Sequence, residues 1–447
     1  MAFKRPALTA EQLALSEARK AKKAKQNGPL APTTASLVNE VKGRIAERKW
    51  IQIKRPDEAL NDHRVKVFTW NLLAQCLVRR ELFPNSNCLK ATQREHMLYR
   101  EILMQDADIL CLQEVDRLEK LVPVIESANY AHRYAAGPNK KHGCLIAFKQ
   151  DYYEEVGSKL ILYDEQKVRD QEGINSCGGT FRTRNIGHIV ALKHKQRNEG
   201  VVVATTHLFW HPKYVYEKAR QAAILKREVV QFKHSIGHDD WPCIISGDFN
   251  FTPDDPVYSL VIGDPILPAQ EERLLPSYVI HSTIDPSIAA VTNKTSNDEN
   301  EEAEAADPDK VITNARPAQL TDGLLSLSEL QAMFTQSGPS LKSAYDNGLR
   351  GYLDSPGTTK PTRTFGDRVN VPSSRRGGYE LEWSSYTFYW KLTLDYIFIL
   401  DAPGGHSTIT GLLSGHRTED LDPGLPQLGV CGSDHVSLSA EIVFAHS

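Results

Sequence analysis

Short apolar runs recur along this chain between residues 65 and 443. The runs at 109–112, 201–204 and 243–245 contain no polar residue, which is typical of strands that are buried on both faces. The runs at 65–71 and 394–400 instead alternate with a period of two, as a strand with two different faces does. The pattern predicts β-strands at 65–71, 109–112, 201–204, 243–245, 394–400 and 436–443.

Two segments between these strands have helical spacing instead. The sequence from Thr92 to Glu95 is that of a capping box, and Leu98 and Ile102 behind it share one helix face. The segment 215–232 places its alanines, Val229 and Phe232 on one side. The chain is therefore expected to combine strands with helices.

The composition changes at two places along the chain. Residues 1–60 include a basic cluster at 19–25 and are expected to form a flexible tail, with a nuclear-targeting or RNA-contacting arm as the alternative. The segment 293–309 holds seven acidic residues and almost nothing apolar, which predicts a disordered acidic insertion near 293–310. Residues 61–447 are then expected to form one catalytic domain.

Overall composition narrows the class of protein only slightly. The 447 residues are 40% hydrophobic and 24% charged, as in ordinary globular proteins, and a net charge of −3 gives no bulk attraction to nucleic acid. None of the seven cysteines has CxxC spacing, so neither a zinc site nor a thioredoxin motif is indicated, and scattered thiols suit a reducing compartment. No apolar run reaches the roughly 18 residues of a membrane span, and the first residues lack the core of a secretion signal. We expect a cytoplasmic or nuclear protein, or one found in both, without a membrane partner.

Polar residues with chemical potential stand at or beside the ends of the predicted strands. They are Asn71, Glu114, His207, Asp248, Asn250, Asp395, Asp434 and His435. Phosphodiester cleavage needs oxygen ligands for a hard cation, a base for water and donors for the phosphate, and this set contains all three. Each residue alone also has an ordinary structural interpretation, so the joint pattern is what favours a phosphodiesterase site.

Glu114 and Asn71 are the candidate metal-binding residues. A carboxylate that ends a buried strand is costly unless it binds a cation or accepts hydrogen bonds, so Glu114 is the candidate ligand for Mg²⁺, or for Mn²⁺. Asn71 offers either an oxygen to the metal or an amide to the phosphate. The alternatives are an exposed turn acid for Glu114 and a strand-ending turn residue for Asn71.

Asp248 and Asn250 are the candidates for activating water and holding the oxyanion. They stand at i and i+2, so on a continuing strand they share a face. Asp248 is then the general base, and Asn250 holds the oxyanion or a metal-bound water. The alternative is a hydrogen-bonded Asx turn.

The histidines complete the predicted phosphate site. His207 is expected to donate to a phosphate oxygen, and His211 and Lys213 to extend that contact. Asp434 stands next to His435 in sequence and is expected to fix its tautomer. Asp395 lies within an apolar strand, where it orients a catalytic histidine or supports the metal.

An aromatic segment at 379–390 precedes the Asp395 strand. Aromatic side chains in a cleft stack on bases, and Tyr386 is the candidate here, although strand packing accounts equally well for half of the cluster. Arg363 leads a group of basic residues at 363–376 that are candidates for contacts with a nucleic-acid backbone.

Taken together, these motifs resemble the endonuclease/exonuclease/phosphatase superfamily. The matching segments are 69–74, 112–115, 206–208, 247–250, 394–398 and 433–435. Segments 142–144 and 341–345 are similar to the deadenylase branch, which includes nocturnin, the Angel proteins and the catalytic subunit of the carbon-catabolite-repressor complex. The likeness to fungal Ngl-type RNA exonucleases is the closest. It implies an α+β fold, a two-layer β-sandwich flanked by helices, and Mg²⁺-dependent 3′-to-5′ hydrolysis of RNA with release of 5′-nucleotides.

The resemblance leaves the substrate open. Poly(A) tails and rRNA precursor ends are both candidate RNAs, and His142 stands where many deadenylases have Asp. The leucine-rich repeats that dock the large deadenylase complex are missing, which argues against membership of that complex and favours a monomer. A phosphatase that acts on a small molecule such as a dinucleotide phosphate is the main alternative, and a binding protein with a vestigial site is a third.

Overall fold

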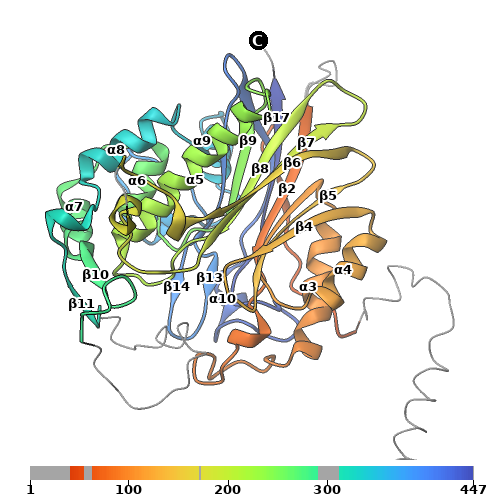
Figure 1. Cartoon of the computed structure of the whole chain (residues 1–447). Coiled ribbons are helices and arrows are strands. Elements are labelled where there is room, and N and C mark those ends of the chain that lie inside the picture. The colour runs from red at the N-terminus through yellow and green to blue at the C-terminus, as the bar shows by residue number, and fades with distance from the viewer. Residues whose placement is uncertain (1–40, 55–62, 171–172, 290–311, 446–447) are drawn as a thin grey trace, which may run out of the picture. The chain divides into compact units, whose positions relative to one another are not determined.

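Two β-sheets packed face to face form the centre of the structure (Figure 1). The structure is a computed structural model, and it describes residues 41–54, 63–170, 173–289 and 312–445. The strands of the first sheet lie in the order β1 (Trp50–Gln52), β16 (His406–Leu413), β17 (Leu438–Ala445), β2 (His63–Asn71), β3 (Ile109–Val115), β5 (Gly143–Lys149) and β4 (Tyr130–Ala136). Those of the second lie in the order β12 (Lys342–Ser343), β15 (Asp395–Leu400), β9 (Cys243–Asp248), β8 (Gly200–His207), β7 (Ile186–His194) and β6 (Tyr153–Leu162).

The main core lies between the two sheets. Ile109 and Cys111 of β3 point into it and meet Val203 of β8 and Ile244 of β9, all fully shielded from solvent. Their neighbours in β3 are fully buried as well, because helices cover the other face. The uninterrupted apolar runs are therefore buried on both faces, as their pattern predicts.

Helices flank both outer faces. The second sheet is covered by α5 (Val215–Ser235), α6 (Pro256–Ile262) and α8 (Leu327–Gln336), whose apolar residues join those of β8 and β9 in a second core. The first sheet is flanked by α3 (Ala91–Gln105) and α4 (Leu118–Ser127). The other helices and strands are α7 (Pro268–Leu274), α9 (Ala344–Leu353), α10 (Thr418–Leu421), β10 (Val279–His281), β11 (Ala315–Pro317), β13 (Ser385–Tyr386) and β14 (Lys391–Leu392).

The first helix begins differently from the predicted capping box. Helix α3 starts at Ala91, so Lys90 is the N-cap and Thr92 lies inside the first turn. The side chain of Gln93 accepts a hydrogen bond from the Lys90 backbone N–H at 3.1 Å, which satisfies a donor that the helix itself leaves unpaired. A glutamine at N3 thus caps this helix without the threonine.

The catalytic unit reaches further toward the N-terminus than residue 61. Strand β1 lies within the expected tail and pairs antiparallel with β16 at the sheet edge. Arg48, just before it, is almost completely buried and forms an ion pair with Glu101 of α3. The basic cluster at 19–25 and the acidic segment 293–309 lie outside the described residues. No helix in the part of the chain that the structure describes is long and apolar enough to span a bilayer.

Candidate active site

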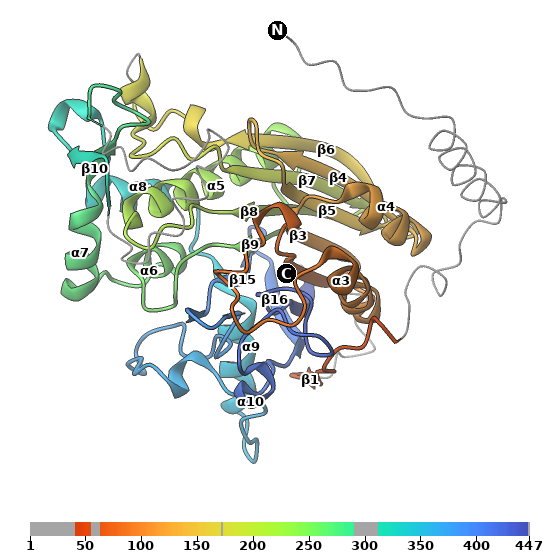
Figure 2. The same ribbon diagram turned by 90° about the horizontal axis from the view of Figure 1, so that it is seen from below.

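The strand register of the second sheet brings three predicted site residues into one row. Asp248, the last residue of β9, pairs with His207 at the end of β8 and with Asp395 at the start of β15. Directly paired residues in a sheet project their side chains from the same face. The view in Figure 2 looks at this end of the sheets. His207 Nε2 accordingly lies 3.6 Å from Asp248 Oδ2.

Glu114 enters the site from the first sheet through a local distortion. The register of β3 with β5 shifts between Leu112 and Val115, and Glu114 has a left-handed backbone with φ of 54°. This conformation is unfavourable for a residue with a side chain and is found where surrounding structure enforces it, often at functional sites. The backbone N–H of Ala74 donates to Glu114 Oε2 at 2.9 Å and fixes the carboxylate.

Asn71 links the two sheets at this point. Its amide nitrogen donates to Glu114 Oε1 at 2.9 Å and to Asp248 Oδ2 at 3.0 Å. The Leu73 backbone N–H donates to Asn71 Oδ1 at 3.0 Å, so the amide is held with its NH₂ toward the carboxylates. Asn71 is therefore placed to hold the two acids side by side.

His435 is oriented by Asp395. His435 Nδ1 lies 2.8 Å from Asp395 Oδ2, and Ser384 Oγ donates to the same oxygen at 2.6 Å. His435 Nε2 points toward Asp248 Oδ2 at 3.6 Å. The expectation that the adjacent Asp434 fixes the tautomer is thus not what the structure shows, because neighbouring side chains along an extended chain point in opposite directions.

Burial and neighbouring charges set the protonation of this group. Burial raises the pKa of Asp395 from 3.8 to about 6, against the opposing effect of His435. Burial alone would lower the pKa of His435, but Asp395 and Asp248 raise it well above 6.5, so the ring is an imidazolium at neutral pH. For His207 burial dominates and lowers the pKa, so this ring is neutral. Burial also raises the pKa of Asp434 to about 6.

Asn250 does not share a strand face with Asp248. Strand β9 ends at Asp248, and Asn250 has a left-handed φ of 53°. Its backbone N–H donates to Asp248 Oδ1 at 3.0 Å, which is the Asx turn that the sequence left as the alternative. Its side-chain nitrogen donates to Leu208 O at 3.0 Å, and the buried Lys218 donates to its carbonyl at 2.8 Å.

The expected substrate-contacting residues differ in how open they are. The Tyr386 ring is 1% exposed and its hydroxyl donates to Asp422, so it leaves no face for a base. His211 is buried and packs against Trp210 and Tyr214, whereas Lys213 is exposed. The exposed Arg363 forms an ion pair with Glu382 at 3.0 Å.

Comparison with known proteins shows which family the chain belongs to. A model described as the Endonuclease/Exonuclease/phosphatase family matches residues 68–435, most of the chain. The chain belongs to this family. Among its relatives, the probable RNA exonuclease C9B6.11c of Schizosaccharomyces pombe is 27% identical over 85% of this chain and 76% of its own. RNA exonuclease NGL2 of Saccharomyces cerevisiae is 27% identical over 86% of this chain and 79% of its own.

A solved structure shows the same fold. The crystal structure of ANGEL2, a 2′,3′-cyclic phosphatase, in complex with adenosine-2′,3′-vanadate, matches 89% of this chain and 99% of its own with a TM-score of 0.57 and 20% identity. The expected α+β sandwich and the expected likeness to fungal RNA exonucleases are both confirmed. This Endonuclease/Exonuclease/phosphatase family member is a hydrolytic enzyme of the nuclease and phosphodiesterase type.

Nucleases of this family generally use a divalent metal ion, and two groups of side chains come into question here. Asp248, Asp395 and His435 place possible ligand atoms within 4.8 Å of one another. In this group Asp395 Oδ2 is already engaged by His435 Nδ1 at 2.8 Å and by Ser384 Oγ at 2.6 Å. Glu114 is oxygen-only, is partly open to solvent and shares the Asn71 amide with Asp248. The carboxylates of Glu114 and Asp248 therefore offer the oxygen ligands that a hard divalent cation prefers.

Three residues without an assigned role in the sequence support the site. Gln113 is fully buried between the sheets and donates to Thr69 Oγ1 at 3.1 Å and to Thr205 Oγ1 at 2.9 Å. Asn185 donates to the His207 carbonyl at 2.9 Å and accepts from Lys140 at 3.0 Å. Gln113 lies in segment 112–115, one of the segments that carry the family resemblance. Lys140 and Asn185 lie just before β5 and β7, two strands that the sequence analysis did not predict, so reasoning from predicted strand ends could not find them.

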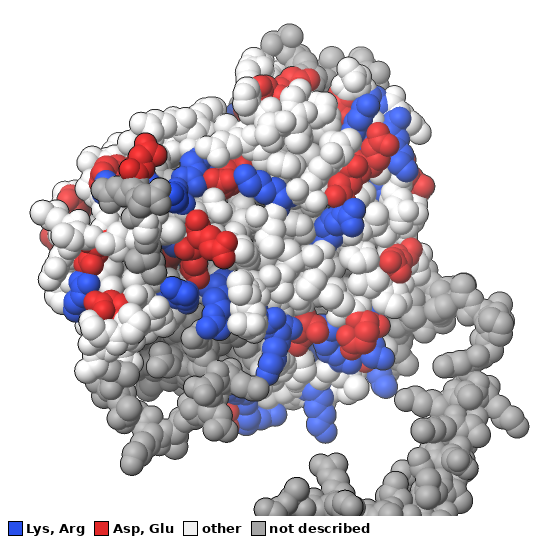
Figure 3. All heavy atoms as spheres, in the orientation of Figure 1, with Lys and Arg blue, Asp and Glu red and all other residues white. Residues whose placement is uncertain are grey.

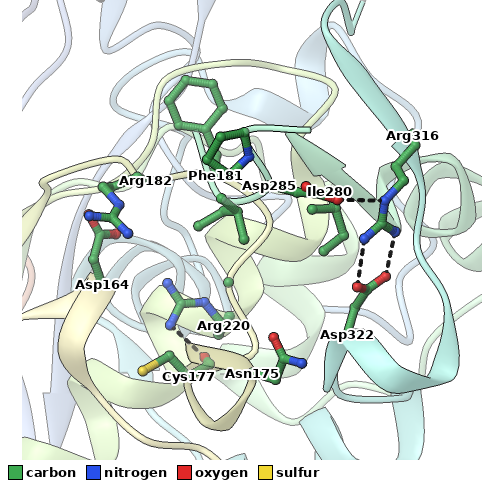
Figure 4. Close-up of a pocket in the computed structure, with 13 residues that line it drawn as sticks. Asp164, Asn175, Cys177, Phe181, Arg182, Arg220, Ile280, Asp285, Arg316 and Asp322 are labelled. Carbon is green, nitrogen blue, oxygen red and sulfur yellow. Dashed lines mark hydrogen bonds and ion pairs between the residues drawn. The ribbon is translucent and has the colours of Figure 1, made fainter. Parts of the chain in front are cut away.

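A separate cavity of about 270 Å³ lies beside α5 and β10 (Figure 4). Two of the three arginines that line it face acids or carbonyls: Arg316 pairs with Asp285 and Asp322, and Arg220 donates to the Cys177 carbonyl. None of the eight predicted strand-end residues lines it. Its charged lining is therefore largely self-satisfied, and the chemistry lies at the sheet ends.

Proposed function

We propose that this protein is a Mg²⁺-dependent 3′-to-5′ exoribonuclease that hydrolyses RNA phosphodiester bonds and releases 5′-nucleotides. The observation that carries the proposal is the Asn71 amide, which holds Glu114 of one sheet and Asp248 of the other within hydrogen-bond distance of one nitrogen. Its relatives named as RNA exonucleases, aligned over most of the chain, favour RNA over a small molecule.

Glu114 is the residue that would hold the metal, with Asp248 as its neighbour across the Asn71 amide. A bound Mg²⁺ would neutralise phosphate charge and position the scissile group. Glu114 is rigid for this task, since Asn71 and the Ala74 N–H each hold one of its oxygens. A carboxylate held in place loses little entropy when it ligates.

Asp248 is placed to take the proton of the attacking water. The Asn250 N–H holds its Oδ1, while its Oδ2 faces the Nε2 atoms of both histidines at 3.6 Å. A water between this carboxylate and a bound phosphate would have its proton acceptor fixed before the reaction begins. The neutral His207 contributes a hydrogen bond without a charge of its own.

His435 supplies positive charge where negative charge develops. Asp395 holds its Nδ1–H, so Nε2–H faces Asp248 Oδ2 at 3.6 Å, and a phosphate bound beside Asp248 would lie next to it. A buried imidazolium is worth more at that point than one in water, because the local dielectric is low. Asp395 thus acts by orienting and charging the ring.

A single-stranded substrate has aromatic groups available on the hairpin whose first strand neighbours His435. Ser385, at the base of the β13–β14 hairpin, forms a bridge with His435. At the tip of the hairpin Phe388 and Tyr389 are 52% and 59% exposed. Stacking of a base on an exposed ring contributes about 1–3 kcal/mol. Basic and acidic side chains are interspersed on the face drawn in Figure 3. The net charge of −3 gives no bulk attraction to RNA, so RNA binding would depend on local contacts and on the metal.

Hydrolysis of 5′-labelled RNA tests the proposal. Wild type, Glu114→Gln and Glu114→Ala would be incubated with RNAs ending in A₂₀ or in mixed sequence, with Mg²⁺ or with EDTA. We expect a Mg²⁺-dependent ladder that shortens from the 3′ end, and a loss of at least about 10³-fold in both variants, because the proposed metal ligand is removed. Circular dichroism of the variants should match wild type.

Two results would contradict the proposal in different ways. Turnover near wild type in Glu114→Gln would remove Glu114 from the metal site. RNA left intact by the wild type, together with phosphate release from a dinucleotide phosphate, would replace the exoribonuclease by a small-molecule phosphatase. The ratio between the A₂₀ and mixed RNAs reports the preference for poly(A).

A further inference from the structure

Arg94 is a buried arginine that binds the backbone of two active-site loops. It belongs to the first turn of α3 and is 2% exposed. Its Nη2 donates to the carbonyls of Leu72 and Leu73, each at 2.5 Å, and its Nε donates to the carbonyl of Gly432 at 2.6 Å. Its Nη1 donates to Gln75 Oε1 at 3.2 Å.

The first of these loops connects Arg94 to Asn71 and Glu114 through two peptide planes. The carbonyl of Leu72 shares a peptide with the N–H of Leu73, which donates to Asn71 Oδ1 at 3.0 Å. The carbonyl of Leu73 shares a peptide with the N–H of Ala74, which donates to Glu114 Oε2 at 2.9 Å. In a planar trans peptide the C=O and N–H point in opposite directions. A guanidinium on one side of these planes therefore fixes both donors on the other side.

The second loop precedes His435. The carbonyl of Gly432 is held by Arg94, and the next residue, Ser433, donates through Oγ to the carbonyl of Asn71 at 2.6 Å. The His435 backbone N–H donates to that same hydroxyl at 3.2 Å. One side chain thus joins the segment that carries Asn71 to the segment that carries His435.

We infer that Arg94 is a positioning residue for the metal site, acting on Asn71 and Glu114 through the peptides that it binds. Leu73 has a left-handed φ of 55°, an unfavourable conformation that surrounding contacts must hold in place. The Arg94 guanidinium supplies such contacts through the carbonyls of Leu72 and Leu73. Charge-assisted donors also polarise the two peptides, which strengthens the N–H bonds on their far side. The inference rests on the proposed function in taking Glu114 as the metal ligand.

Metal affinity, measured on the folded protein, tests this role. Mn²⁺ binding would be followed by electron paramagnetic resonance and calorimetry in wild type, Arg94→Lys, Glu114→Ala and Arg100→Lys. Lysine keeps the charge at position 94 but has no planar fork that reaches two loops at once. Arg100 lies on the same helix, pairs with Glu47 at 3.6 Å near the surface and serves as the matched control.

We expect Mn²⁺ affinity to fall about 10- to 100-fold in Arg94→Lys, the usual effect of losing a partner that orients a ligand, and to stay unchanged in Arg100→Lys. Methylguanidinium added to Arg94→Ala should restore part of the affinity. A folded Arg94→Lys that binds Mn²⁺ within twofold of wild type would overturn the inference, even if it melts at a lower temperature.

A milder variant covers the case in which neither Arg94 variant folds. Gln75→Leu removes the acceptor of Nη1, together with the bond from Gln75 Nε2 to the Leu89 carbonyl, and leaves the buried charge in place, so affinity should fall about three- to fivefold. Unchanged affinity there would overturn the inference as well. Mn²⁺ binding that Glu114→Ala leaves intact would instead contradict the proposed function, so the two failures are distinguishable.

Discussion

The pair formed by Asp395 and His435 determines the charge that the site presents to a phosphate. The carboxylate and the ring are both buried, and their contact of 2.8 Å replaces the water that each has lost. The pKa of His435 rises only because carboxylates outweigh burial, which by itself would lower it. The positive charge on His435 thus depends on its carboxylate neighbours, of which Asp395 has the largest effect.

Replacing Asp395 by Asn should therefore make His435 easier to deprotonate. With the first carboxylate gone, burial has more weight against the remaining Asp248 and Asp434, and the pKa of the ring should fall. We expect hydrolysis to fall by about 10²- to 10⁴-fold at neutral pH, as for loss of a general acid or its orienting group. NMR titration of the ring protons of His435 checks the direction.

The raised pKa of His435 also makes the free energy of unfolding depend on pH. A histidine whose pKa is raised by folding stabilises the folded state below its unfolded pKa of about 6.5, and this contribution is lost as pH rises through the folded value. Wild type should therefore gain from this ring in acid and lose that gain in alkali, while Asp395→Asn should gain less. A ring that titrates equally in both proteins would contradict the assignment.

Residue identities were accessible from the sequence, but their contacts were not. A buried strand that ends in an acid is costly, so Glu114 and Asp248 stand out without any structure. Which acid orients His435 depends on the pairing of β15 with β9, and sequence adjacency suggests Asp434 instead. The prediction that Asn250 shares a strand face with Asp248 was wrong for a similar reason, because the i, i+2 spacing does not show that Asn250 has a left-handed backbone.

Among the elements, the contact between β8 and β9 depends on Gly247. This glycine has φ of 151° and lies opposite Thr206, and a Cβ built on it would stand 2.1 Å from the Thr206 carbonyl oxygen. The flanking pair is His207 and Asp248, so a shift here separates two site residues. No rotamer relieves the clash, because the atom that it meets is backbone.

Gly247→Ala should cost roughly 3 kcal/mol or more in unfolding free energy and should also reduce hydrolysis. Gly351 is the matched control, since it is exposed in α9 with nothing within 4 Å of its ideal Cβ. Gly351→Ala should instead stabilise by about 0.5–1 kcal/mol. Urea denaturation followed by circular dichroism compares the two, and equal midpoints would mean that β8 and β9 tolerate the displacement.

Elements with strong periodicity were found by pattern, and weaker ones were not. Each of the six predicted strands corresponds to an observed strand, with ends moved by at most three residues, and the predicted helix 215–232 is α5, Val215–Ser235. Among the strands of six or more residues, β4, β5, β6, β7 and β16 were not predicted. In β6 exposed and half-buried residues alternate along most of the strand, so its run has too few apolar positions to stand out.

At the scale of the whole catalytic unit, the site exists only where the two sheets meet. Asn71 and Glu114 come from the first sheet, His207, Asp248 and Asp395 from the second, and His435 from the loop before β17. Gln113 ties β3 to β8 directly beneath this junction. The pattern of apolar runs predicts strands but not which strands pair, so this arrangement followed from the family resemblance and not from periodicity.

The N-terminal limit of this unit gives a test at the same scale. Residues 41–54 add β1 to the sheet edge, and Arg48 supplies the partner of the buried Glu101 and donates to the Ser437 carbonyl at 2.7 Å. Removing one member of a buried ion pair costs about 3–5 kcal/mol, because the remaining charge is left without compensation. That is a large part of the roughly 5–15 kcal/mol by which a domain is stable.

A variant that begins at residue 61 should accordingly be poorly soluble or unfold at a much lower urea concentration, with loss of hydrolysis. A variant that begins at residue 41 keeps every contact described above and should unfold like the full chain. Arg48→Met in the full chain separates the ion pair from β1, and should account for about half of the loss. If the variant beginning at residue 61 were as stable as the full chain, β1 and Arg48 would be dispensable, and the unit would begin at β2.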